Sequence, residues 1–90
     1  MEVWVYVIES VTDQVWYTGM AIDPVRRLAD HNACRNRFTK GHLPWKLIFT
    51  ERHENWKGGR VREKYLKSAS GKNWLRKFLL SGGDTGSLPA

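Results

Sequence analysis

The sequence predicts an α+β fold in which a small three-stranded antiparallel sheet is flanked by helices. Three observations favour this class. Strand-like runs of β-branched and aromatic residues fill the N-terminal part, apolar residues recur at helical spacing in the C-terminal part, and turn residues separate these segments. The predicted order is therefore strand, strand, helix, strand, helix, helix. The 90 residues have room for one domain, which we expect over residues 1–81, with a flexible tail over residues 82–90.

The first third of the chain predicts a β-hairpin followed by a helix. Residues 3–9 and 15–20 read as strands, and the polar residues between them form the turn. Asp23 can cap a helix, and Pro24 suits its first turn because proline lacks the N–H group that remains unpaired there. We therefore expect the first helix over residues 24–34.

A loop and a third strand follow. Residues 35–45 are expected to form the loop because Gly41 and Pro44 interrupt regular structure. Residues 46–52 return to a strand pattern with three apolar side chains in succession. This strand would complete the antiparallel sheet, whose apolar faces need helical cover.

The last third of the chain predicts two helices. Asn55 can cap the first of them, which should extend to about Ser70. Gly71 is expected to separate it from the final helix over residues 72–80, whose apolar residues form one stripe. Together with Leu28 of the first helix, apolar residues of these two helices are the candidates to cover the sheet.

Positive charge gathers in the second half of the chain. Fifteen Lys and Arg against nine Asp and Glu give a formal charge of +6, although residues 1–25 contain no Lys or Arg. Residues 55–80 hold eight cations and one acid, Glu63. Such a field attracts polyanions, and phosphate contacts supply most non-specific affinity for nucleic acid. A solvated helix surface is the alternative interpretation of the same block.

Composition excludes several other classes. A hydrophobic content of 41% and five tryptophans argue against disorder, and no apolar stretch approaches the roughly 20 residues of a membrane span. The N-terminus starts directly in a strand pattern without a secretion signal, so we expect a cytoplasmic location. Cys34 is the only cysteine, which excludes an intramolecular disulfide. No pair of His or Cys has the spacing of a structural zinc site, and no small-molecule cofactor is expected.

Several short motifs follow one another in a fixed order along the chain. They are Val5-Tyr6-Val7, Tyr17-Thr18-Gly19, the run Arg26 to Asn32, Phe38-Thr39-Lys40-Gly41, Pro44-Trp45-Lys46-Leu47 and the run Arg62 to Lys67. This order, over about residues 3–80, resembles the GIY-YIG nuclease family and its small stand-alone bacterial members. The resemblance implies metal-dependent hydrolysis of a DNA phosphodiester. The chain departs from the family pattern at Trp4-Val5 and Thr18, and it has Met20 where some repair-type members carry a lysine.

The resemblance also implies a set of site residues. The candidate catalytic residues are Tyr6, Tyr17, Arg27, His31 and Glu63. Glu63 is the candidate ligand of one divalent cation, Mg²⁺ or Mn²⁺, because hard cations prefer carboxylate oxygen and accept few protein ligands. The other interpretation makes Glu63 a surface partner of Arg60 or Lys67, at i,i+3 and i,i+4 spacing.

The two tyrosines also have two interpretations. Tyr17 is expected to act as the general base or to orient the attacking water, with Tyr6 hydrogen-bonded nearby. A phenol with a pKa of about 10 is a poor base at neutral pH, so adjacent cations would have to lower that pKa. Without the resemblance, both residues would be read as amphipathic core tyrosines on neighbouring strands.

Arg27 and His31 lie four residues apart, so their side chains should share one face of the first helix. Arg27 is expected to bind a non-bridging phosphate oxygen, because a guanidinium is permanently charged and forms bidentate contacts. His31 is expected to accept a proton from Tyr17 or to contact the phosphate. A solvated helix histidine is the alternative.

Further cations are expected to contact the nucleic-acid backbone. These are Arg26, Arg37, Lys40, Arg62, Lys64 and Lys67. Two function classes remain open on this basis: an endonuclease, or a catalytically inactive nucleic-acid-binding module of the same fold. Flaps, branches, nicks and single strands of DNA are all compatible substrates, as is RNA, and a protein partner is compatible with so small a module.

Overall fold

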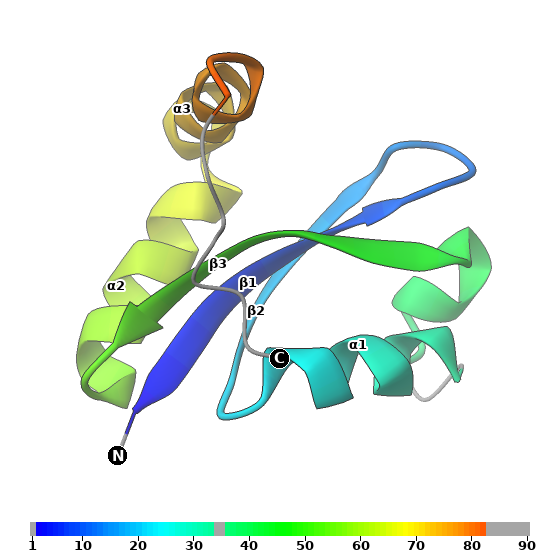
Figure 1. The fold of residues 1–90 in the computed structure, drawn as a ribbon, viewed down its shortest axis with the longest axis horizontal. Coiled ribbons are helices and arrows are strands. Elements are labelled where there is room, and N and C mark those ends of the chain that lie inside the picture. Colours follow the sequence, from blue (N-terminus) through cyan, green and yellow to red (C-terminus); the bar gives the residue numbers. More distant parts are fainter. Residues whose placement is uncertain (1, 34–35, 83–90) are drawn as a thin grey trace.

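The computed structural model describes residues 2–33 and 36–82 and confirms the α+β class (Figure 1). Three strands form one antiparallel sheet in the order β2-β1-β3: β1 (Val3–Ser10), β2 (Trp16–Ala21) and β3 (Trp45–His53). The helices are α1 (Pro24–Asn32), α2 (Trp56–Lys67) and α3 (Ala69–Leu80). The predicted order of these elements is therefore confirmed.

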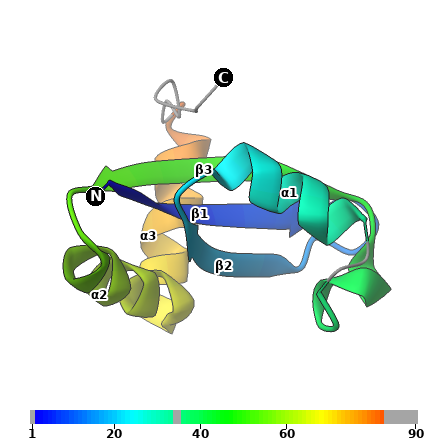
Figure 2. The same ribbon diagram turned by 90° about the horizontal axis from the view of Figure 1, so that it is seen from below.

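The sheet is covered on both faces. Figure 2 shows α1 on one side of the sheet and α3 on the other. Because successive side chains of a strand point to opposite faces, Val5 and Val7 pack with Leu66 and Leu75 below α2 and α3. Tyr6 and Ile8 instead belong to the core cluster on the face that α1 covers, with Ala21 and Trp45. The middle strand β1 thus supplies both cores.

Two predicted helix starts are confirmed. The Asp23 side chain accepts a hydrogen bond from the Arg26 backbone N–H at 3.1 Å, and Pro24 begins α1. The Asn55 side chain accepts from the Gly58 N–H at 2.9 Å. Each cap satisfies a backbone donor that has no partner within its own helix.

The predicted break between the last two helices is wrong. Gly71 lies inside α3, and the chain turns at Ser68, which is both the C-cap of α2 and the N-cap of α3. The Ser68 hydroxyl donates to the Tyr65 carbonyl at 2.6 Å and accepts from the Gly71 N–H at 3.1 Å. Gly71 is needed for close approach, because a Cβ there would lie 1.9 Å from the Tyr65 carbonyl oxygen.

We expect Gly71→Ala to lower the free energy of unfolding by about 3 kcal/mol or more, because a methyl group would collide with backbone that cannot move aside. Urea unfolding of the purified variant measures this loss. Gly41→Ala is the matched control, since a Cβ at Gly41 has no neighbour within 4 Å. An equal, small change in both variants would contradict the packing argument.

The connection between α1 and β3 is more regular than predicted. Thr39–His42 form a 3₁₀ helix, η1, within the expected loop. The Asn36 side chain starts it by accepting from the backbone N–H groups of Phe38 and Thr39. α1 ends at Asn32 rather than at residue 34. The flexible tail predicted over residues 82–90 lies, apart from Gly82, outside the described residues.

Within the described part of the chain, no helix combines the length and apolar character that crossing a membrane requires.

Candidate active site

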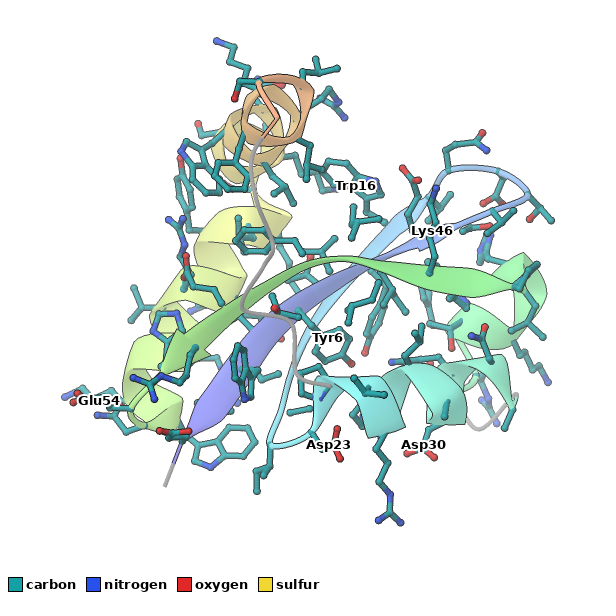
Figure 3. The ribbon with its side chains drawn as sticks, viewed as in Figure 1. Tyr6, Trp16, Asp23, Asp30, Lys46 and Glu54 are labelled. Carbon is teal, nitrogen blue, oxygen red and sulfur yellow. The ribbon has the colours of Figure 1, made fainter. Side chains whose placement is uncertain are left out.

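Tyr6 lies at the centre of the candidate site, on the middle strand. Its ring is 1% exposed and lies between the sheet and α1 (Figure 3). Gly19 is its direct partner on β2, and a Cβ at Gly19 would lie 2.6 Å from the Tyr6 hydroxyl oxygen. The glycine of the second motif is therefore needed because the Tyr6 ring occupies the space above it.

A chain of hydrogen bonds runs from Tyr6 to η1. The Tyr6 hydroxyl is 3.0 Å from His31 Nε2, and His31 Nδ1 is 2.9 Å from the Thr39 hydroxyl oxygen. That hydroxyl donates to the Asn36 backbone carbonyl at 3.4 Å. Since a carbonyl can only accept, the direction of the chain follows: His31 Nδ1–H donates to Thr39, and Nε2 accepts from the Tyr6 O–H. This assigns a neutral His31 in the Nδ1–H tautomer.

Burial keeps both ends of this pair uncharged. Loss of solvation raises the pKa of Tyr6 to about 12, although the nearby Arg27 guanidinium acts in the opposite direction. Burial also lowers the pKa of His31, and the positive charge of Arg27 lowers it further. The interpretation of His31 as a solvated helix residue is therefore wrong, since its side chain is 1% exposed.

The lowered pKa of His31 predicts a loss of stability in acid. The unfolded chain binds a proton at this imidazole below about pH 6.5, whereas the folded chain resists it, so the stabilisation is present above that pH and lost as pH falls. We expect the free energy of unfolding, measured with urea at pH 7 and pH 5, to fall less in His31→Gln than in the wild type. Identical pH dependence in His31→Gln and the wild type would contradict the assignment.

The rings of Tyr6, Tyr17 and His31 form one cluster, and Tyr17 is its most exposed member. It is half-buried on β2, and its ring meets the His31 ring edge-on at 4.9 Å between centroids. The Tyr6 and Phe38 rings lie at 6.5 and 5.7 Å from it. Phe38 is 55% exposed and stands beside Tyr17 at the surface.

Arg27 lies one helical turn before His31 on α1, as their spacing predicts. Its side chain is 44% exposed and contacts Asp30 at 3.8 Å. Its charge nevertheless reaches the cluster, because it lowers the pKa values of both Tyr6 and His31. Arg27 is therefore an exposed cation within electrostatic reach of Tyr6 and His31.

Glu63 approaches the cluster from α2. Its carboxylate is 15% exposed and forms ion pairs with Arg60 at 3.6 Å and Lys67 at 3.3 Å, so the ion-pair interpretation is confirmed. Its negative charge also contributes to the raised pKa of Tyr6, which places the carboxylate within electrostatic reach of the tyrosines. Both roles are compatible, because Arg60 and Lys67 are 69% and 55% exposed and such surface pairs contribute only about 0.2–1 kcal/mol.

A divalent cation fits Glu63 only as a site with one protein carboxylate. Among residues 2–33 and 36–82, no three His, Cys, Asp or Glu side chains gather in a way that could hold a metal. Mg²⁺ commonly binds through one or two carboxylates and completes its shell with water and substrate phosphate. The donor set is therefore compatible with Mg²⁺ or Mn²⁺ bound together with a nucleic-acid phosphate.

Most of the predicted phosphate-binding cations lie on the surface. The exposed ones are Arg26, Arg37, Lys40, Lys64 and Lys67. Arg62 differs: its Nε donates to Glu51 at 3.0 Å, and its guanidinium lies 4.5 Å from the centre of the Trp74 ring. Its charge thus holds α2 against β3 and α3, and a contact between Arg62 and nucleic acid stays a prediction.

Sequence reasoning missed Thr39 and Asn36, which complete the hydrogen-bond chain from Tyr6. Thr39 is fully buried, and its backbone carbonyl also accepts from the Trp45 indole N–H at 2.7 Å. The available signal was Thr39 within the motif Phe38-Thr39-Lys40-Gly41. Thr39 reaches His31 only because η1 folds next to α1, and the spacing of residues along the sequence does not reveal that arrangement.

The three-stranded antiparallel sheet thus brings two tyrosines close to an arginine and a histidine on one helix, with a glutamate on another helix in electrostatic reach. A family model described as the GIY-YIG catalytic domain matches residues 2–77, and the chain belongs to the GIY-YIG family. That family is generally one of endonucleases. The resemblance seen in the motif order is thereby confirmed.

The chain is also similar to proteins named UPF0213. It is 37% identical over 68 residues to the one from Natronomonas pharaonis, covering 74% of this chain and 79% of that protein. It is 36% identical over 69 residues to the one from Listeria monocytogenes, covering 76% of each. The solution NMR structure of a Bacillus halodurans UPF0213 protein matches with a TM-score of 0.54 at 28% identity, over 87% of this chain and 85% of that one. These names specify no activity, and the likeness supports the same fold.

Proposed function

We propose that this chain is a metal-dependent endonuclease that hydrolyses phosphodiester bonds in DNA. The observation that carries the proposal is the convergence of Tyr6, Tyr17, Arg27 and His31 on the side of the sheet that α1 covers, with the Glu63 carboxylate in electrostatic reach. Membership of the GIY-YIG family supports the same class of reaction.

The two tyrosines have different tasks in this proposal. Tyr6 is buried, its pKa is raised to about 12 and its hydroxyl is held by His31, so it stays a neutral phenol that positions its neighbours. Tyr17 is half-buried at the surface of the cluster and is the phenol that orients the attacking water or accepts its proton. His31 acts through Tyr6 and the Tyr17 ring, since its burial keeps it from the phosphate.

Two groups stabilise the negative charge of the phosphate in this proposal: Arg27 and a cation held by Glu63. Arg27 contacts a non-bridging oxygen and stabilises the negative charge that builds up in the transition state. Glu63 would hold the divalent cation, which when bound supplies Lewis-acid stabilisation of the phosphoryl and leaving oxygens. The exposed cations Arg26, Arg37, Lys40, Lys64 and Lys67 bind backbone phosphates.

The test is cleavage of labelled single-stranded, duplex, flap and branched DNA in Mg²⁺, in Mn²⁺ and in EDTA. We expect cut products in the presence of either metal and none in EDTA, with the four substrates ranked by rate. DNA that is bound under every condition and never cut would overturn the enzyme and leave the inactive nucleic-acid-binding module of the same fold.

A further inference from the structure

A hollow of about 440 Å³ lies directly beside Arg27. It is formed where the end of β2, the start of α1 and the first residue of α2 meet. The lining residues are Met20, Ala21, Ile22, Asp23, Arg26, Arg27, Asp30 and Trp56. Its volume is within the range of small-molecule sites, and it shares Arg27 with the candidate active site. A group in this hollow would therefore lie next to a phosphate held by Arg27.

The charges of this hollow favour a neutral occupant. Two arginines and two aspartates line it, so their formal charges cancel. Asp30 forms an ion pair with Arg27, and Asp23 caps α1, which satisfies part of this charge within the protein. The second hollow, of about 290 Å³, is different: Lys72 and Arg76 outnumber Glu9, and it lies with Trp16 at the opposite end of β2. That hollow carries a net positive charge, whereas the balanced charges of the hollow beside Arg27 suit a neutral group that lies next to the phosphate.

Large apolar side chains stand exposed in the hollow beside Arg27. Trp56 is 47% exposed and Ile22 is 56% exposed, although both are side chains that folding normally covers. Proteins that bind single-stranded nucleic acid combine cations for the phosphates with exposed aromatic side chains, because every base can stack on an aromatic face. The accessible Trp56 indole next to Arg27 is such a combination. Ile22 and Met20 add apolar surface around the indole.

We propose that this hollow holds one unpaired nucleobase, stacked on Trp56, from the strand whose phosphate Arg27 contacts. The inference rests on the proposed function and adds a substrate class to it. A base can enter only after it leaves the duplex stack, so DNA that already offers an unpaired base at this position is favoured over intact duplex. Single-stranded and flap DNA meet that condition.

Binding in the absence of cleavage tests the proposal. Glu63→Gln protein serves as the non-cutting background, and fluorescence anisotropy gives its Kd for a labelled thymidine oligonucleotide of about 12 nucleotides. The comparison probe has the same length and phosphates but carries abasic residues throughout. We expect Trp56→Ala to weaken binding of the thymidine probe by about tenfold and to leave binding of the abasic probe unchanged.

Two further variants sharpen the result. Trp56→Phe keeps an aromatic face and should restore most of the affinity. Leu80→Ala removes an apolar side chain that is 82% exposed and lies outside the hollow, and it should bind both probes like the background protein. Equal weakening of both probes by Trp56→Ala, or no weakening of either, would overturn base stacking. Because cleavage is measured separately in the wild type, failure of the nuclease proposal is seen independently of this result.

Discussion

Glu63→Ala is expected to lower the rate of DNA cleavage by at least about a thousandfold, because several kcal/mol of transition-state stabilisation depend on the metal that this carboxylate would hold. The fold should persist, since the ion pairs that Glu63 makes with Arg60 and Lys67 lie at the surface. DNA affinity should stay equal or rise, because the substitution removes a negative charge from a basic helix. Single-turnover cleavage with saturating Mg²⁺, together with a binding titration, measures both quantities.

Glu54→Ala is the matched control for this result. Glu54 is an exposed acid shortly before α2, and its side chain points outward from the loop that precedes the helix (Figure 3). Its removal changes the net charge by the same amount as Glu63→Ala without touching the cluster around Tyr6. If Glu63→Ala cuts at the wild-type rate, the metal assignment is wrong; if both variants lose activity equally, the effect is one of overall charge.

Arg27→Ala is expected to reduce turnover roughly a hundredfold while changing Kd for DNA less than about fivefold. The reason is that a guanidinium beside the reacting phosphate contributes most when negative charge builds up in the transition state. The variant should also raise the pKa of Tyr6 still further, because Arg27 opposes the effect of burial on that group. Comparing single-turnover rate constants with Kd for the same substrate separates the two contributions.

The neighbouring Arg26→Ala provides the contrast. Arg26 is exposed on the same helix, and its backbone N–H rather than its side chain takes part in the Asp23 cap. We expect its loss to weaken binding with little effect on the rate constant at saturation. Equal losses in rate and affinity for Arg27→Ala would assign Arg27 to simple phosphate binding.

The elements were predictable because local chemistry determines them. Asp23, Pro24 and Asn55 start helices through backbone donors that must find partners, and the hairpin follows from two β-rich runs around a short turn. The break at Ser68 was not predictable in the same way. Gly71 suggested a helix end, but its actual role is close packing against Tyr65, which depends on how the two helices meet.

The part of the candidate site that lies on one helix was predictable from the sequence. The part formed where β1, α1 and η1 meet was not. The i,i+4 spacing of Arg27 and His31 placed both on the side of α1 that serves the site. The burial of His31 between Tyr6 and Thr39 could not be read from that spacing, because it requires η1 to fold back over α1. The Trp56 hollow was missed for the same reason: Trp56 comes from α2, far along the chain from the stretch 20–30 that supplies the other lining residues.

The shared cap at Ser68 joins the candidate metal ligand to the hydrophobic core. One residue ends α2 and begins α3, and Gly71 packs closely against the Tyr65 backbone. The angle between the two helices is therefore fixed. α3 is in turn locked to the sheet by Phe49, Trp74 and Phe78, whose rings contact one another. The position of Glu63 relative to the tyrosines therefore depends on core residues that lie far from it. Substituting Phe49, Trp74 or Phe78 offers a way to shift Glu63 without changing any residue of the candidate site.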